Sequence, residues 1–253
     1  CASSATAETT MPGPNRPPNA IRRRLRFSLR TLLVGMLLLG LVFAILAAIA
    51  GEAKRQRMVI ADLKSQGADF VFEDRPAYLP QWLDTGYSRR ATYITLAFER
   101  KFADVRPLAE CQGLEELDLS GTAVVDVSPL AGLSQLEGLE LSWTQVSDVS
   151  PLGELSNLQT LELNEAPVTD VSSLAALEKL EYLDLTATNV LDVSALAALR
   201  NLEYLLLSHT PVADVAPLAT LQSLRYLEIY DTQVTDEQAK QLQQALPHCH
   251  IFR

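Results

Sequence analysis

Acidic side chains recur every 22 residues in the C-terminal part of the sequence. We call such a set of positions, spaced by 22 residues, a column, and this column also contains one leucine. The members of this column are Asp118, Glu140, Glu162, Asp184, Leu206 and Glu228. The residues two positions earlier include three consecutive tyrosines, Tyr182, Tyr204 and Tyr226. Carboxylates attract cationic groups, and tyrosines are rigid amphipathic side chains that are enriched at binding hot spots. The pattern predicts a surface that binds a partner of basic character.

Two further aromatic residues extend this candidate surface. Tyr230 ends the column two positions after the carboxylates, and Trp143 stands one position further along its unit, where the neighbouring units carry Gly121 and Glu165. A large aromatic side chain among small and polar ones indicates a contact residue, although the ring could instead fold over its own loop. The carboxylates also have a second interpretation. Carboxylates about 4.8 Å apart repel by a little less than ~1 kcal/mol per pair, and their charge could serve only to keep an exposed sheet soluble.

A second acidic column consists of aspartate alone. Its members are Asp126, Asp148, Asp170, Asp192, Asp214 and Asp236. An unbroken row of carboxylates could bind calcium. Several of these aspartates, however, open the sequence Asp-Val-Ser-Pro-Leu, in which a side-chain oxygen can cap free N–H groups and proline suits the first helical position. We therefore interpret this column as structural and expect no metal site.

The usual signatures of catalysis are missing from the sequence. It has three histidines and no GxSxG, HExxH or P-loop motif, so nucleophilic, zinc and nucleotide chemistry lack their usual residues. His209 and Asp231 fall in one column and could form a surface ion pair, while His248 and His250 could bind a metal weakly on the last strand. Because neither place has a nucleophile, we predict a protein that is not an enzyme and needs no cofactor.

Charge is distributed unevenly along the 253 residues. Residues 1–57 carry nine Lys and Arg against two Asp and Glu, whereas residues 114–253 carry five against 21. Binding to nucleic acid needs Lys and Arg to neutralise phosphates. The acidic C-terminal part therefore excludes nucleic acid as a partner.

Cysteine usage indicates neither a zinc ribbon nor a redox site, because the sequence has no CxxC motif. Cys111 and Cys249 lie at opposite ends of the repeated region, each 22 residues from a column leucine. Strands stack about 4.8 Å apart, so six steps would separate the two thiols by roughly 29 Å, far beyond the reach of a disulfide. We predict two buried free thiols.

The spacing of all these residues is set by a leucine repeat of the same period. Three columns made mostly of leucine begin at Leu114, Leu117 and Leu119, and a valine column begins at Val124. Leucines that alternate in this way predict a short strand followed by a turn. One unit cannot bury its own apolar face, whereas stacked units can, so the pattern predicts a solenoid.

The pattern LxxLxLxxTxVxDVSPLxxL resembles the 22-residue leucine-rich repeat of bacterial internalin-like proteins, over about residues 92–253. The resemblance implies an α/β solenoid, a right-handed superhelix with a parallel β-sheet on the concave face and short 3₁₀ turns on the convex face. It also implies that the concave face binds partners. The family often has asparagine in the column where this chain has Ala166 and otherwise threonine. A threonine hydroxyl can still bond the backbone of the turn.

Residues 31–50 form an uncharged apolar stretch of 20 residues, which as a helix would span the ~30 Å hydrocarbon layer of a membrane. Six Arg residues precede it and four Lys and Arg residues follow it, so the positive-inside rule places the basic arm of residues 1–30, expected to be disordered, in the cytoplasm. We expect a single-pass protein of the cytoplasmic (inner) membrane with its repeat domain outside the cytoplasm. The alternative is signal-peptide cleavage near Ala50, which would leave a secreted or periplasmic protein.

The ends of the array depart from the repeat, as the caps of a solenoid should. Residues 93–113 are predicted to form a degenerate first unit, and residues 236–252 a helix and a final strand. Upstream, residues 51–91 are predicted to form a juxtamembrane helix and an N-terminal cap that includes a strand at residues 68–74. The repeat domain is assigned to residues 92–253.

The sequence therefore predicts a membrane-anchored binding module that recognises a protein or peptide through an acidic, tyrosine-lined concave face. The residues expected to contact this partner are Asp118, Glu140, Trp143, Glu162, Asp184, Tyr182, Tyr204, Tyr226, Glu228 and Tyr230. Two alternatives remain open. The chain could be a structural envelope scaffold, or a non-catalytic accessory subunit of an enzyme complex.

Overall fold

The computed structural model describes residues 29–74 and 89–253. The chain divides into two compact units, residues 1–46 and residues 47–253. Most of the arm predicted at residues 1–30 lies outside the described residues, as does the part of the predicted N-terminal cap between residues 75 and 88.

Helix α1 (Leu29–Ser65) covers both the apolar stretch and the predicted juxtamembrane segment without a break. The transmembrane helix that we expected at residues 31–50 is not supported. Within the described part of the chain, none of the helices combines the length and the apolar character needed to cross a membrane.

The C-terminal end of α1 packs against the stacked strands and turns that follow it. We call this whole stacked part, described at residues 69–74 and 89–253, the repeat unit. Leu63 is fully buried there, and Val59 is partly buried against the same core. The helix stops because Gly67 takes a φ of +100°, which glycine adopts readily, and the Ala68 N–H then donates to the Leu63 carbonyl at 3.0 Å. This turn leads the chain directly into the first strand.

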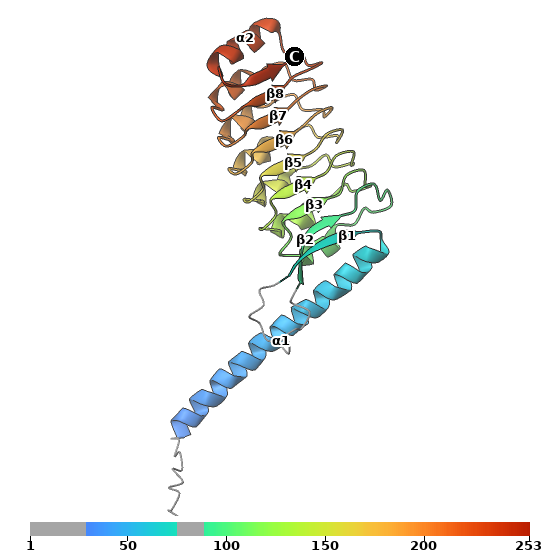
Figure 1. Ribbon diagram of the computed structural model, residues 1–253, viewed down its shortest axis with the longest axis vertical. Helices are drawn as coiled ribbons and strands as arrows, with labels where there is room; N and C mark the ends of the chain where they lie inside the picture. Colours follow the sequence, from blue (N-terminus) through green and yellow to red (C-terminus); the bar gives the residue numbers. More distant parts are fainter. Residues whose placement is uncertain (1–28, 75–88) are drawn as a thin grey trace, which may run out of the picture. The chain divides into compact units, whose positions relative to one another are not determined.

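A single sheet of nine strands forms one side of the repeat unit, and its strands follow one another in chain order (Figure 1). The strands are β1 (Asp69–Asp74), β2 (Arg89–Thr95), β3 (Glu116–Asp118), β4 (Gly138–Glu140), β5 (Thr160–Glu162), β6 (Tyr182–Asp184), β7 (Tyr204–Leu206), β8 (Tyr226–Glu228) and β9 (His250–Phe252). β1 pairs antiparallel with β2, and every later pair is parallel. The strand predicted at residues 68–74 is confirmed as β1.

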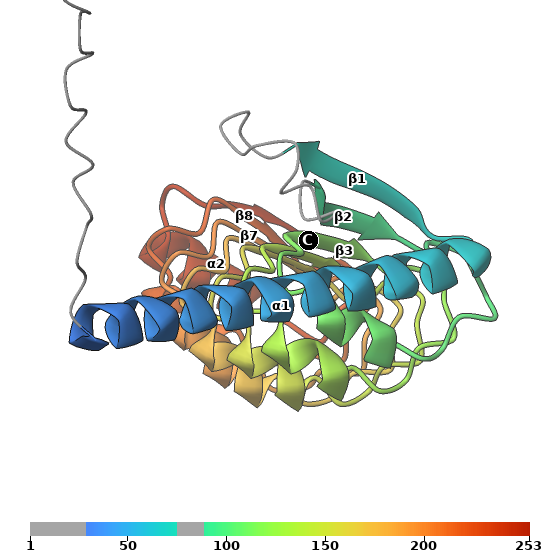
Figure 2. The same cartoon turned by 90° about the horizontal axis from the view of Figure 1, so that it is seen from below.

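Short 3₁₀ helices form the other side of the repeat unit, away from the strands (Figure 2). They are η2 (Arg106–Glu110), η3 (Ser128–Gly132), η4 (Ser150–Glu154), η5 (Ser172–Ala176), η6 (Ser194–Ala198) and η7 (Ala216–Thr220). In the last unit this place is taken by α2 (Asp236–Ala245), whose N-terminus is closed by a capping box between Thr235 and Gln238. The predicted solenoid with parallel strands and 3₁₀ turns is confirmed, together with the predicted terminal helix and strand.

The core is a column of leucine and valine between the two sides. The middle residue of each short strand, such as Leu139 or Leu161, is fully buried, and so is the leucine inside each 3₁₀ helix, such as Leu152. From β3 to β8 the strands pair residues 22 apart. Each unit therefore presents the same apolar side chains to the next, which is how short units obtain a shared core.

At both ends of the sheet, paired residues are separated in the sequence by more than the 22-residue repeat length. Thr95 pairs with Asp118, which lies one position beyond the repeat length, and Glu228 pairs with Phe252, which lies two positions beyond it. Leu227 consequently pairs with Ile251, so our assignment of Cys249 to the leucine column was wrong, because the last unit contains an insertion. Cys111 and Cys249 are nevertheless buried free thiols, as predicted, and burial raises the pKa of each thiol to about 11.

The aspartate column caps the 3₁₀ helices from the position before the N-cap residue, which is a valine without a side-chain cap bond in each described 3₁₀ helix. One side-chain oxygen of each of five aspartates accepts the backbone N–H two residues later, at 2.8–2.9 Å. These five are Asp126, Asp148, Asp170, Asp192 and Asp214. Asp104 makes the same bond to Arg106, so the row begins one unit earlier than predicted. The assignment was wrong for Asp236, which opens α2 behind the Thr235 cap and pairs with Arg253.

Candidate functional site

Strand alternation divides the side chains of the sheet between core and solvent. In β3 to β8 the middle residue is buried, whereas the first and third residues point to the other side of the sheet. We call this outer side, formed by the first and third residues of β3 to β9, the sheet face. It is the face that the family resemblance describes as concave, and it carries the predicted acidic and tyrosine columns.

Two glutamates in the middle of the acidic column have perturbed acidity. Partial burial, together with the charges of Asp118, Glu162 and Glu116, raises the pKa of Glu140 to about 7. Partial burial, followed by the charges of Asp184 and Asp118, also raises the pKa of Glu162. Both shifts mean that the folded chain disfavours the charged carboxylates, so a cation placed between them would relieve an existing cost.

The two aspartates that flank these glutamates are engaged in local hydrogen bonds. Asp118 accepts the Ser120 N–H at 2.9 Å and the Thr95 hydroxyl at 3.0 Å. Asp184 accepts the Thr186 N–H at 2.8 Å and is 8% exposed. The structure thus gives Asp184 a role in the turn after β6, which the sequence did not reveal.

The predicted tyrosines form a continuous ladder on the first residues of β6, β7 and β8. The ring centroids of Tyr182 and Tyr204 are 6.1 Å apart, and those of Tyr204 and Tyr226 are 6.2 Å apart. Phe252 of β9 extends the ladder, with its ring centroid 4.7 Å from that of Tyr226. We call these four residues the aromatic ladder. Burial, followed by the charge of Asp184, raises the pKa of Tyr182 to about 12, so its hydroxyl is uncharged at neutral pH.

A small hollow interrupts the sheet face at Gly138, which occupies the tyrosine column and has no side chain. Its volume is about 130 Å³, and Gly138 forms part of its wall together with Tyr93, Glu116, Glu140 and Thr160. Two carboxylates and one phenol ring therefore surround a space of side-chain size. This combination suits a cationic side chain, because a cation can contact an aromatic face and carboxylates at the same time.

Trp143 lies on a loop beside the sheet face, directly after β4, rather than on a strand. Its side chain is 47% exposed, and its ring centroid lies 6.1 Å from that of Phe98. The ring therefore contacts the preceding loops and does not fold over its own loop alone. Tyr230, on the corresponding part of the loop after β8, is 42% exposed, and its N–H donates to the Ser208 hydroxyl at 3.2 Å.

The histidine sites considered in the sequence have simple environments. The Nδ1 of His209 lies 3.1 Å from the Oδ2 of Asp231, and the two side chains are 59% and 82% exposed, so they form the expected surface pair. His248 precedes β9, while His250 is exposed on the sheet face at its end. Among residues 29–74 and 89–253, no cluster of three or more His, Cys, Asp or Glu side chains is placed to hold a metal ion.

Sequence reasoning missed three aromatic residues on the sheet face or beside it, namely Tyr93, Phe98 and Phe252. All three lie in the terminal units, where the offset between paired strands is longer than the repeat length. A strictly periodic alignment therefore moves them out of their columns. A signal was available in the shared order of apolar residues, which could have been aligned with short insertions.

The solved structures that resemble this chain include two proteins from Listeria monocytogenes. An internalin (inlF) is 34% identical, with a TM-score of 0.60, and the match covers 64% of this chain and 46% of that one. An internalin C2 (inlC2) is 28% identical, with a TM-score of 0.60, and the match covers 64% of this chain and 70% of that one. The chain thus spans less than half the length of the first of these proteins.

A leucine-rich-repeat protein of Leptospira interrogans has the same fold at 22% identity, with a TM-score of 0.57, over 60% of this chain and 40% of that one. The comparison with curated proteins found no match. A family model described as a leucine-rich repeat region matches residues 94–251. Because this match spans more than half of its length, the chain belongs to the leucine-rich repeat family.

Proposed function

We propose that this chain is a binding module that recognises a basic segment of another protein through the sheet face. The observation that carries the proposal is that one face of the sheet carries both a row of carboxylates, on β3 to β6, and the aromatic ladder of contacting rings, on β6 to β9. Leucine-rich repeat folds typically serve as protein-interaction modules, which supports the same class of function. Enzymatic activity has no place in this proposal.

The physical basis is that neither feature is required by the fold. Burial of an apolar ring stabilises a core, yet Tyr204 and Phe252 remain 42% and 38% exposed. Glu140 and Glu162 are half-buried beside other acidic groups, which costs folding free energy. A cationic partner would satisfy both, because Lys and Arg side chains interact with aromatic faces and neutralise carboxylates.

The hollow at Gly138 would receive one cationic side chain of the partner. A Cβ at this position would lie 3.4 Å from the Glu116 Cγ, which is an ordinary contact, and the backbone there does not require glycine. Threonine occupies the same column in the next unit, at Thr160. A Gly138→Thr variant should therefore fold normally while filling the hollow.

The test is capture of partners from envelope extract by the full chain and by a variant in which Glu140, Glu162 and Glu228 are changed to Lys. The expected result is a partner that the native chain retains and that both this variant and Gly138→Thr lose. A matched control reverses Asp126 and Asp148 to Lys on the opposite side of the unit, and should retain the partner. Equal retention by all variants, with circular dichroism showing that each is folded, would exclude the sheet face as the binding surface and favour a scaffold.

The location of the repeat domain outside the cytoplasm stays a prediction, supported by the apolar stretch at residues 31–50 and the Arg residues that precede it. Protease added to spheroplasts that express the full chain should degrade the repeat domain while a cytoplasmic marker survives. Complete protection of the repeat domain until the cells are lysed would contradict this location.

A further inference from the structure

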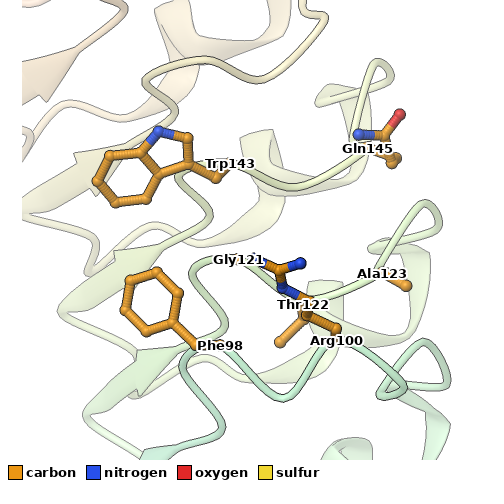
Figure 3. Close-up of a pocket in the computed structure, with 7 residues that line it drawn as sticks. All are labelled: Phe98, Arg100, Gly121, Thr122, Ala123, Trp143 and Gln145. Carbon is orange, nitrogen blue, oxygen red and sulfur yellow. The ribbon is translucent and has the colours of Figure 1, made fainter.

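The loops that follow β2, β3 and β4 line a shallow, open pocket of about 470 Å³, which we call the rim pocket (Figure 3). Its walls come from three successive units, and its lining residues are Phe98, Arg100, Gly121, Thr122, Ala123, Trp143 and Gln145. Figure 3 shows the rings of Phe98 and Trp143 on the same side of the loop at Gly121. A space of this volume is in the range of ligand-binding pockets.

Neither the backbone nor the core accounts for the two aromatic residues. Phe98 and Trp143 have φ values of 63° and 57°, in the left-handed region that bulky residues avoid. Their side chains are 64% and 47% exposed, so little burial offsets this conformational cost. Later units place small or polar residues in the same column with nearly the same φ, including Ala187 at 56°. The fold thus accepts a small residue here, and the two rings are most readily explained by contact with a ligand.

Gly121 allows the two rings to come together. It lies between them in the column and has a φ of +68°. A Cβ added at this position would lie 2.7 Å from the Phe98 Cδ1, too close for any side chain. The absence of a side chain lets the Phe98 ring lean over the middle unit, and the two ring centroids reach 6.1 Å at an interplanar angle of 34°. The result is an aromatic platform that spans three units.

A cation stands beside this platform. Arg100 lines the pocket and is exposed, and its guanidinium forms no ion pair within the described residues. Arg100 is the one charged residue among those that line the pocket. Gln145, which also lines the pocket, adds an amide that can both donate and accept a hydrogen bond.

We propose that the rim pocket binds a segment of a partner protein in which an aromatic side chain stands next to a carboxylate, as in Phe-Glu. The partner's ring packs on Phe98 and Trp143, and its carboxylate pairs with Arg100. Aromatic rings prefer offset or tilted contact with other rings, and guanidinium groups bind carboxylates in two-point geometry. This occupant differs from the basic segment proposed for the sheet face, because the same carboxylate would be repelled by Glu140 and Glu162. The two sites therefore favour partner segments of opposite charge.

The test uses the full chain in mild detergent and the peptide acetyl-Gly-Gly-Phe-Glu-Gly-Gly-amide, in which the phenylalanine carries one ring fluorine. Binding broadens the fluorine NMR signal of the peptide, so weak affinity can be measured, and detergent without protein serves as the blank. A second peptide has Lys in place of Glu. We expect the Glu peptide to bind at least ~10-fold more tightly than the Lys peptide, because like charge at Arg100 disfavours the latter.

Variants of the protein assign the binding to the pocket. Trp143→Ala should weaken binding of the Glu peptide ~10-fold or more, as expected for an aromatic hot spot, and Ala187 shows that alanine is accepted at this backbone conformation. Arg100→Gln should remove the preference for the Glu peptide over the Lys peptide. Glu165→Ala, in the same column but outside the pocket lining, is the matched control and should bind like the native chain.

Equal affinity for the two peptides, or unchanged binding by Trp143→Ala, would overturn the proposal. The outcome is separable from that of the sheet-face experiment, because the variant with Lys at 140, 162 and 228 keeps every residue that lines the rim pocket. This variant should bind the Glu peptide at least as well as the native chain.

Discussion

Two rows of carboxylates run along the repeat unit with the same period, and their environments are opposite. On the side of the 3₁₀ helices, hydrogen bonds from the serine two residues later lower the pKa of Asp126, Asp148, Asp170 and Asp192. On the sheet face, partial burial and neighbouring carboxylates raise the pKa of Glu140 and Glu162. A repeated charge therefore bonds the start of a turn in one row, whereas Glu140 and Glu162 in the other row carry a cost to folding.

The difference shows how function can be separated from structure in a repeat protein. Each unit must meet the same packing and capping requirements, so residues that serve the fold recur with little variation. Apart from Asp118 and Asp184, which bond the turns after their strands, the acidic and aromatic columns of the sheet face meet fewer such requirements, and these columns vary between acidic, aromatic and small residues along the array. Variation within a column, at positions that the core does not need, marks the surface that is available for a partner.

The largest effect is expected from the core that both rows share. Leu161→Ala removes a fully buried side chain between Thr160 and Glu162 and should lower the free energy of unfolding by about 2–5 kcal/mol. Both sides of the unit should lose stability together, because they are anchored to the same column. Urea denaturation followed by circular dichroism measures the change. A loss below ~1 kcal/mol would mean that the two rows do not depend on a common core.

The second-largest effect is expected from a substitution in the row of capping aspartates. Asp170→Ala removes the acceptor of the Ser172 N–H at 2.8 Å and should lower the melting temperature by about 2–4 °C at neutral pH. Asp170→Asn keeps an acceptor oxygen and should lose less. The lowered pKa of Asp170 means that its contribution is present at neutral pH and is lost as the pH falls through that pKa. Differential scanning calorimetry of the three proteins would refute the capping role if alanine and asparagine behaved alike.

The threonine column between the two rows provides a third comparison. Thr122, Thr144, Thr188 and Thr210 are buried, and each hydroxyl donates to the carbonyl three residues earlier at 2.6–2.7 Å. Ala166, in the same column, has no such group. Ala166→Thr should raise the free energy of unfolding by about 0.5–1 kcal/mol by adding this bond. Chemical denaturation tests it, with Ala166→Val as the control that adds the volume without the hydroxyl. Equal stability of the two variants would show that the bond contributes nothing.

The smallest effect should have the opposite sign. Glu140→Leu, which copies Leu206 of the same column, should stabilise the fold by a few tenths of a kcal/mol at pH 8, since it removes one partly exposed repelling charge. The pKa of Glu140 is raised to about 7, so the native carboxylate destabilises the fold above that pH and the penalty disappears as the pH falls towards its ordinary value near 4.5. Melting temperatures from pH 5 to 8 measure the gain. A gain that is independent of pH would contradict repulsion as its cause.

Much of this architecture was predictable because, in a repeat protein, the local pattern of one unit also determines how that unit packs on its neighbours. The 22-residue spacing identified the strand leucines, the capping aspartates and the three ladder tyrosines, since each unit meets nearly the same neighbours, and the departure from that spacing indicated the terminal helix. Even Asp104 was within reach, because it lies one repeat before Asp126. The candidate contact residues Glu140, Glu162 and Tyr182 all lie on the predicted side of the sheet.

The terminal units were less accessible, because their insertions shift the pairing. The ring of Phe98 reaches Trp143, and the ring of Phe252 reaches Tyr226, only because the first and last units are longer than the repeat. A strictly periodic alignment has no such insertion, although the shared order of apolar residues could have indicated one.

The sequence by itself determined which side chains lie in the core and which lie in solvent, because alternation along a strand and a fixed repeat length leave little freedom. Tertiary structure decided how the exposed residues act together. It brought Phe98, Arg100 and Trp143 into one pocket, and it made Glu140 a weaker acid than a solvated glutamate. The physical reason is that burial, ring contact and electrostatic coupling depend on distances of a few ångströms between units, and these distances are fixed only when the units stack.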